Sequence, residues 1–249
     1  MSRGIKLTMQ PLEVVFPIIH EQFFFDELER HDETFIVFCC LPKTVHTVPT
    51  SDSLTMKIEQ NSLDRLFLKA RTANGFLDKP VPQELLQEVY DLAKMAPTSM
   101  NTQPTRYVFL TTPEAKSRLL PTLSPGNLEK TQSAPVTVIV ATDSRFYEHM
   151  PQIWHVAGAK ENFEGNATLA TNTSNRNGTL GGAYFIMAAR AIGLDCGPMS
   201  GVDLGKVNAE FFPDGRCSAN FLINLGYADQ SKEFKRNPRL SFEQACQVL

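Results

Sequence analysis

The stretch Ala96-Pro97-Thr98-Ser99-Met100-Asn101-Thr102-Gln103-Pro104 carries hydroxyl and amide side chains between two prolines. It follows a segment from Pro82 onward with apolar residues at helical spacing, and it precedes a strand-like segment over residues 106–111. Polar groups on a turn between rigid elements are typical of a ligand-binding loop. The same side chains also satisfy backbone groups in ordinary connectors, so the composition alone leaves both interpretations open.

The segments around this turn predict an α+β domain. Apolar residues at helical spacing predict helices over residues 63–70, 82–96 and 114–120. Segments rich in Val, Ile and aromatic residues predict strands over residues 106–111, 135–142 and 219–227. Residues 179–192 are apolar nearly all round and include small residues, which predicts a closely packed core helix. We therefore expect a small antiparallel or mixed sheet wrapped by helices.

Residues 1–55 differ from the rest of the chain. Two apolar islands, Phe23–Phe25 and Thr34–Leu41, are separated by an acidic cluster and followed by the turn-rich residues 42–53. They show neither helical nor alternating spacing, so a short hairpin and a segment that does not fold independently are both compatible with them. We expect the main domain to span residues 56–249 and the extension over residues 1–55 to be dispensable.

The composition is that of a soluble globular protein. Of the 249 residues, 42% are apolar and 20% are charged, and the formal net charge is -3. This balance offers no basic surface for nucleic acid, which we do not expect as a partner. The five cysteines form no C-x-x-C pair, which favours reduced thiols. The early apolar run over residues 35–41 is too short to span a membrane, and no secretory signal precedes it, so we expect a cytoplasmic protein.

Standard catalytic motifs are absent from the sequence. It contains no G-x-G-x-x-G, no phosphate-binding P-loop, no G-x-S-x-G and no H-E-x-x-H. Its histidines stand at no metal-ligand spacing with a cysteine or carboxylate, so we expect no metal. Because a Rossmann fingerprint is missing, tightly held nicotinamide is not expected, and a redox function would need another cofactor.

The segment 97–104, P-T-S-M-N-T-Q-P, resembles the P-S-S-x-N-x-Q-P motif of the nitroreductase family, which contacts the ring and ribityl chain of FMN. The resemblance implies that the flavin-binding residues here are Pro97, Thr98, Ser99 and Asn101. Other segments that resemble the family follow in the family's order, and together they cover about residues 60–249.

Four such segments stand outside the turn. Arg71-Thr72-Ala73-Asn74-Gly75-Phe76 resembles the N-terminal phosphate and flavin motif, which implies cofactor contacts by Arg71, Thr72 and Asn74. Asn127-Leu128-Glu129-Lys130 resembles the N-x-x-K pair that reaches the pyrimidine side of the flavin. Gly197-Pro198-Met199-Ser200-Gly201 resembles a loop whose backbone N–H groups face N5 and O4 of the ring. Arg236 and Arg239 resemble the basic pair that grips the phosphate.

Chemistry supports these implied roles. The resemblance gives flavin contacts to Asn127, Lys130, Pro198, Met199, Ser200 and Gly201, and it makes Lys130, Ser200 and Gly201 the catalytic candidates. A terminal phosphate needs fixed cations, and a reduced flavin carries negative charge that a lysine can stabilise. Taken singly, Arg71 is compatible with a solvated helix residue, Lys130 with a surface lysine and Gly197 with a helix C-cap. Because these segments occur together and in the same order as in the family, a flavin-binding site is favoured over the separate interpretations.

Three segments resemble the branch of the family that contains malonic semialdehyde reductases, also called 3-hydroxypropionate dehydrogenases. They are residues 126–131, 194–201 and 238–243. The resemblance implies an FMN-dependent homodimer that reduces malonic semialdehyde to 3-hydroxypropionate with NADH or NADPH. Broader reduction of nitro compounds, quinones or flavins, and flavin binding without turnover, are the alternatives. Asn74, Ser200 and Thr105 stand where the family commonly has a basic, an acidic and an aromatic residue.

Overall fold

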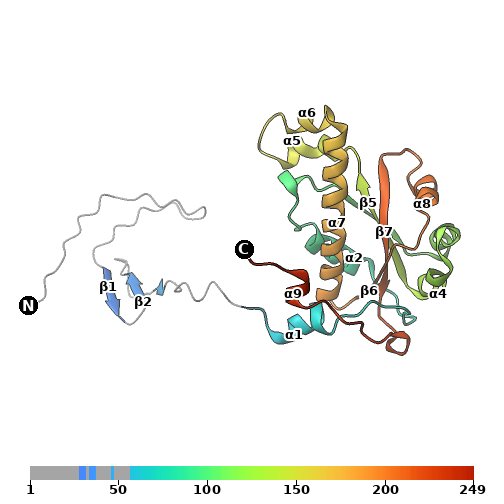
Figure 1. The fold of residues 1–249 in the computed structure, drawn as a ribbon, viewed down its shortest axis with the longest axis horizontal. Coiled ribbons are helices and arrows are strands. Elements are labelled where there is room, and N and C mark those ends of the chain that lie inside the picture. Colours follow the sequence, from blue (N-terminus) through green and yellow to red (C-terminus); the bar gives the residue numbers. More distant parts are fainter. Residues whose placement is uncertain (1–27, 32–33, 38–45, 48–56) are drawn as a thin grey trace, which may run out of the picture. The chain divides into compact units, whose positions relative to one another are not determined.

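The computed structural model describes residues 28–31, 34–37, 46–47 and 57–249, which fall into two compact units divided between Glu59 and Gln60 (Figure 1). In the first unit, β1 (Leu28–His31) pairs antiparallel with β2 (Thr34–Val37), and β2 pairs with β3 (His46–Thr47). Paired strands were one of the two alternatives that the sequence left open for this region. The triplet Phe23–Phe25 lies outside the described residues.

The second unit is built on a four-stranded antiparallel sheet with the order β4-β5-β7-β6. Its strands are β4 (Thr105–Leu110), β5 (Val136–Asp143), β6 (Asp195–Met199) and β7 (Cys217–Gly226). Every residue of β5 is buried, because helices cover both faces of the sheet and β4 and β7 flank the strand. The α+β class and the three predicted strands are confirmed, with ends shifted by one or two residues.

The strand β6 was not predicted, because residues 197–201 were expected to form a loop. The run Asp-Cys-Gly-Pro-Met lacks the β-branched and aromatic residues that favour strands. Its strand conformation comes from pairing with β7 at the edge of the sheet. Pro198 is tolerated there because the backbone on the outer side of β6 is paired only at Cys196, with residues 72 and 73. Only Ser200 and Gly201 of the expected loop lie outside the strand.

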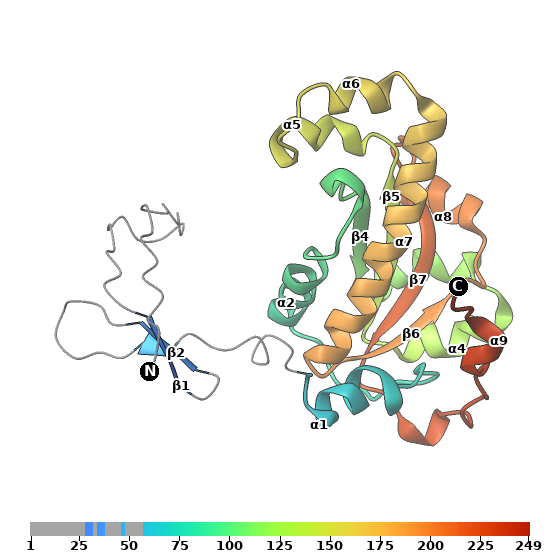
Figure 2. The same cartoon turned by 60° about the vertical axis from the view of Figure 1, so that its left-hand side comes forward.

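The helix α7 (Ala167–Ala191) runs along one face of the sheet (Figures 1 and 2). Its glycines permit close contact: a Cβ on Gly181 would lie 2.1 Å from Thr105 Oγ1, and one on Gly182 would lie 2.5 Å from Phe221. The predicted close packing is therefore confirmed. The helix begins well before residue 179. The sequence pattern did not predict its first half, because that half is polar and carries no apolar periodicity. The helix ends before Gly193 (φ +96°), so the predicted C-cap alternative for Gly197 is wrong.

The other helices cover the two faces and the ends of the sheet. α2 (Gln83–Ala93) packs beside α7 on one face, and α3 (Pro113–Leu119), α4 (Pro125–Ser133) and α8 (Leu204–Phe211) lie on the other. Around one end of α7 are η5 (Phe146–His149), α5 (Met150–Ile153) and α6 (Ala159–Glu164), with a small core of their own. The short elements are α1 (Gln60–Leu63), η2 (Asp64–Leu68), η3 (Ser99–Asn101), η4 (Leu120–Thr122), η6 (Gln230–Lys232) and α9 (Phe242–Ala245). Among the described residues, we find no helix with the length and apolar character that crossing a membrane requires.

Candidate functional site

The turn between α2 and β4 has an unusual backbone. Met100, Asn101 and Gln103 have φ values of +50°, +54° and +42°, in the left-handed region that favours glycine. Such a conformation costs a residue with a side chain on the order of 1–3 kcal/mol, and it persists only where surrounding contacts hold it. Strain of this kind is concentrated at functional sites, which supports a binding role for the turn.

Hydrogen bonds from three parts of the chain hold this turn. The Oδ1 of Asn177, on α7, accepts from the Ser99 N–H at 2.8 Å. Asn101 donates from Nδ2 to the Ile153 carbonyl at 2.9 Å, and its Oδ1 accepts from Gln103 Nε2 at 3.0 Å. Within the turn, Thr98 Oγ1 accepts from the Gln103 N–H at 3.3 Å. The turn is thus fixed against both α7 and α5.

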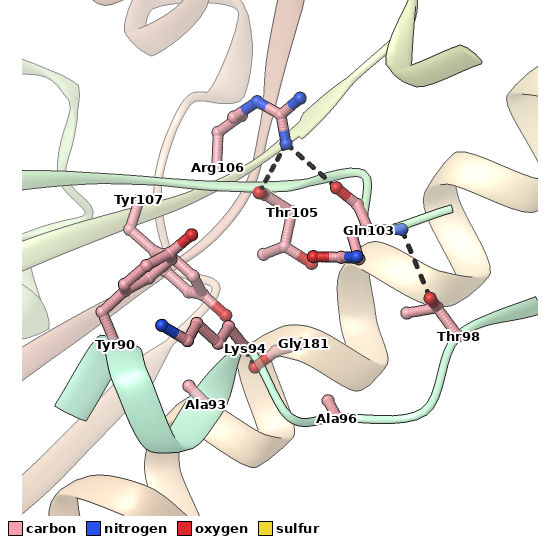
Figure 3. Close-up of a pocket in the computed structure, with 10 residues that line it drawn as sticks. All are labelled: Tyr90, Ala93, Lys94, Ala96, Thr98, Gln103, Thr105, Arg106, Tyr107 and Gly181. Carbon is pink, nitrogen blue, oxygen red and sulfur yellow. Dashed lines mark hydrogen bonds between the residues drawn. The ribbon is translucent and has the colours of Figure 1, made fainter. Parts of the chain in front are cut away.

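A buried carboxylate fixes the end of the turn. Asp143 is 1% exposed and accepts from Arg106 Nη2 at 2.7 Å and from Arg216 Nη2 at 3.1 Å. Figure 3 shows Arg106 donating to the carbonyls of Gln103 and Thr105, beside a small cavity of about 80 Å³ beneath the turn. Because its charge is balanced by Asp143, Arg106 is held where it can bind both carbonyls.

Sequence reasoning missed Asn177, Arg106 and Asp143 as supports of the site. Their partners lie far away along the chain, 78 residues for the pair Asn177–Ser99 and 37 residues for the pair Arg106–Asp143. A single sequence gives no signal for such pairs. Pro97 and Ser99 themselves are exposed, so the surface of the turn is available to a ligand.

A second group of predicted residues gathers around β6. The Ala73 N–H donates to the Cys196 carbonyl at 3.0 Å, and Thr72 forms a parallel bridge with Cys196. A Cβ on Gly197 would lie 2.5 Å from the Ala73 carbonyl oxygen, so this glycine allows the two segments to touch. Thr72 and Ala73 therefore lie directly against β6, which contains the first three residues of the expected flavin-facing loop.

Two of the three predicted arginines lie on neighbouring segments. Arg71 donates to the Phe234 carbonyl and pairs with Glu233 at 3.8 Å. Arg236 donates to the carbonyls of Leu68 and Ala70 at 2.9 and 2.8 Å. The guanidinium groups of Arg71 and Arg236 thus both connect residues 68–71 with residues 233–236. Arg239, by contrast, donates to the carbonyls of its own neighbours, residues 237 and 238.

Asn74 and Lys130 share a cleft of about 560 Å³. Its other lining residues are Gly126, Glu129, Ser231, Lys232, Glu233 and Phe234. Partial burial lowers the pKa of Lys130, because desolvation disfavours its charged form. Two of these lining residues form an ion pair, with Lys232 Nζ 3.2 Å from a Glu129 carboxylate oxygen. Within the described part of the chain, no cluster of three or more His, Cys, Asp or Glu side chains is arranged to hold a metal.

Buried polar contacts position α4 against the sheet. Thr137 donates to Asn224 Oδ1 at 2.8 Å, and Asn224 donates to Thr131 Oγ1 at 3.1 Å. Thr131 in turn lies 3.8 Å from the sulfur of Met199. Because Thr131 follows Lys130 directly, this network fixes the helix that carries the lysine. At the end of β6, Ser200 is exposed.

The two groups of residues lie at opposite edges of the sheet. The turn over residues 97–104 leads into β4, whereas residues 71–74 and Lys130 surround β6, and β5 and β7 lie between. Three inter-strand spacings amount to roughly 14 Å across the sheet. Figure 2 shows the green turn toward the α5 end of α7, and β6 and α4 toward the other end. A single chain therefore does not bring residues 97–101 beside Lys130.

Comparisons with known proteins agree with the fold. The model of the nitroreductase family matches residues 68–227. A relative from Polynucleobacter asymbioticus, named "Putative NADH dehydrogenase/NAD(P)H nitroreductase", is 51% identical over 192 residues, which are 77% of this chain and 98% of the relative. A relative of the same name from Stenotrophomonas maltophilia is 52% identical over 191 residues, 77% of this chain and 97% of the relative.

Solved structures show the same fold. A "putative nitroreductase" from Bacillus subtilis superposes with a TM-score of 0.69 at 21% identity, covering 77% of this chain and 100% of the other. A "putative nitroreductase" from Exiguobacterium sibiricum, solved in complex with FMN, has a TM-score of 0.68 at 16% identity and covers 78% and 100%. The family model matches more than half of the chain, and the relatives from Polynucleobacter asymbioticus and Stenotrophomonas maltophilia are 51% and 52% identical to it. We conclude that this chain belongs to the nitroreductase family.

Proposed function

We propose that this protein is an FMN-dependent NAD(P)H oxidoreductase that acts as a homodimer and reduces malonic semialdehyde. One observation carries the proposal. Three segments remote in sequence meet around β6 and supply Arg71, Asn74, Lys130 and Gly201, whereas the strained turn lies at the opposite edge of the sheet. Two copies of the chain are needed to place both groups on one ligand.

The residues around β6 fit FMN. Arg71 and Arg236 lie on two segments that contact each other, and their guanidinium groups suit a phosphate because they offer fixed, charged donors. Bound FMN would supply the exchange of hydride between NADH or NADPH and the acceptor. The relative from Exiguobacterium sibiricum binds FMN on the same fold, which supports this cofactor.

Lys130 has the environment of a residue that stabilises negative charge. Desolvation lowers its pKa, so an anion beside its Nζ would relieve an unfavourable state and raise that pKa again. A charge held in place by α4 requires little reorganisation when negative charge develops near it. We assign Lys130 to the pyrimidine side of the flavin, with Asn74 lining the same cleft.

An exposed apolar surface on α2 and α7 supports the homodimer. On α7, Leu180 is 42% exposed and Tyr184 is 41% exposed. On the adjacent α2 and just beyond it, Leu92 and Met95 are 44% and 75% exposed. Large apolar side chains grouped on neighbouring helices are typical of a protein interface. We infer that a second copy covers them and that, in this dimer, the 97–101 turn of one copy lies at the β6 edge of the other.

The substrate assignment rests on the sequence phrases that resemble the malonic semialdehyde reductase branch. A second candidate function is the reduction of nitro compounds, which the names of relatives about 50% identical favour. Ser200 stands where nitroreductases often have an acidic residue, and Thr105 stands where they commonly have an aromatic one. These differences favour the small aldehyde acid over bulky nitroaromatic compounds.

The test is a substrate comparison on the purified full chain. The protein should release FMN on denaturation, and NADH or NADPH should bleach the bound flavin. Malonic semialdehyde should then be reduced with a higher kcat/KM than a nitroaromatic compound, a quinone or free FMN. A higher value for the nitroaromatic compound would select the second candidate. Flavin binding without bleaching would indicate a storage protein, and failure to bind FMN would contradict the proposal.

A further inference from the structure

The Gly201 carbonyl joins the end of β6 to the start of α4. Its oxygen accepts two hydrogen bonds, from the Ser124 N–H at 3.0 Å and from Asn127 Nδ2 at 2.7 Å. The other end of the same peptide unit is also fixed, because the Val202 N–H donates to the Ser200 carbonyl at 2.9 Å. The orientation of this peptide therefore depends on the Asn127 side chain.

Packing at this junction leaves no spare room. Asn127 is 9% exposed, and a Cβ on Gly201 would lie 2.6 Å from its Nδ2. A contact under 3.0 Å requires one of the two groups to move. The Asn127 side chain can therefore keep its present position only if residue 201 has no side chain. Lys130 follows Asn127 by one turn of the same helix, so this contact also sets the distance between Lys130 and Gly201.

We propose that Asn127 is a positioning residue that holds the Ser200–Gly201 backbone in register with Lys130. This inference rests on the proposed function, in which both groups face one flavin. The Nδ2 of Asn127 is committed to the Gly201 carbonyl. Asn127 thus acts on the reaction through the backbone that it orients, beyond the direct flavin contact that the family resemblance implies for it.

The first experiment is a thermodynamic cycle on the full chain. Gly201→Ala should lower the midpoint of thermal unfolding, because its methyl group meets Asn127. In the Asn127→Ala background this methyl group has room, so Gly201→Ala should cost about 2–4 °C less there than in the parent. The contact with Ser124 Oγ, at 3.3 Å, is present in both backgrounds and cancels. Equal losses in the two backgrounds would overturn the inference.

The second experiment separates positioning from stability. Asn127→Asp keeps the size of the side chain and removes the donor to Gly201. It should lower the rate of flavin reduction at saturating NADH by about tenfold or more and leave the KM for NADH within about twofold. Gln132→Ala, on the same helix and exposed, is the control and should react like the parent. An unchanged rate in Asn127→Asp would leave Asn127 a structural residue and overturn its positioning role.

The two proposals fail in different ways. If the parent protein does not bind FMN, the proposed function is wrong, and the positioning role is then excluded before any variant is made. If the parent binds FMN and is bleached by NADH, but the cycle is additive, only the inference about Asn127 fails.

Discussion

The Oδ1 of Asn177 accepts a hydrogen bond from the backbone N–H of Ser99 at 2.8 Å, although 78 residues separate the two. Asn177 is 3% exposed, and its Nδ2 donates to the Thr173 carbonyl within α7. The side chain therefore transmits the rigidity of the core helix to a turn with three left-handed residues. The shape of a surface turn depends here on a residue buried in the core.

We expect Asn177→Ala to loosen the turn. The Ser99 N–H loses its partner, which should lower the free energy of unfolding by about 1–3 kcal/mol and weaken FMN binding. Asn177→Asp keeps the acceptor and should retain more of the FMN affinity than the alanine variant. Asn175→Ala, on an exposed position of the same helix, is the control. Chemical denaturation and flavin fluorescence titration measure both effects, and equal FMN affinities in all variants would remove Asn177 from the site.

We expect Asp143→Asn to destabilise the protein strongly. The substitution removes the buried carboxylate that both Arg106 and Arg216 contact, and because the two guanidinium groups are partly exposed the loss should be about 1–3 kcal/mol. Arg106 also loses the partner that holds it against the carbonyls of the turn. Glu148→Gln removes the more exposed partner of Arg216 and should cost less than about 1 kcal/mol. Similar losses of unfolding free energy in the two variants would contradict this ranking.

We expect Lys130→Met to separate stability from catalysis. Because burial lowers the pKa of Lys130, its charge is unfavourable in the folded state below the lysine pKa of the unfolded chain. The variant should therefore fold at least as stably as the parent at neutral pH. Loss of a preorganised charge partner should slow flavin reduction by about 10²–10³-fold.

The pH dependence of flavin reduction provides a second measurement. In the parent, the rate should fall as the pH rises through the pKa of Lys130, whereas Lys130→Met should lack this step. Lys206→Met, at an exposed lysine of α8, should behave as the parent does in stopped-flow measurements. Equal reduction rates in Lys130→Met and the parent would leave Lys130 a surface residue.

We expect Leu180→Asp to dissociate the proposed homodimer. A carboxylate on the exposed apolar face of α7 would be buried without a partner in the interface. The parent should sediment at twice the chain mass of 27.8 kDa, and the variant at the mass of one chain, without bound FMN. Leu204→Asp, on α8, is a matched control because Leu204 has a similar exposure of 37%. A monomeric Leu180→Asp protein that still binds FMN would show that one chain suffices.

Sequence patterns predicted the family, the α+β class and three strands of the sheet, because these features depend on local composition and on motif order. They missed β6, whose conformation depends on pairing with β7, and the polar first half of α7. They also missed Asn177 and Asp143, which act through residues remote in the chain. The predicted boundary at residue 56 lies close to the division of the structure at Gln60, and whether residues 1–55 are dispensable stays a prediction.

The assembly of one site from two chains is tested most directly by pairing two different variants in one dimer. One variant carries Arg71→Ala and Arg236→Ala, which remove the proposed phosphate-binding cations near β6. The other carries Ser99→Leu, which obstructs the turn at the opposite edge. Each homodimer should bind no FMN. The mixed dimer should bind one FMN, because one of its two sites receives both intact groups. A mixed dimer without FMN would contradict the account, because it would mean that each chain builds its own site.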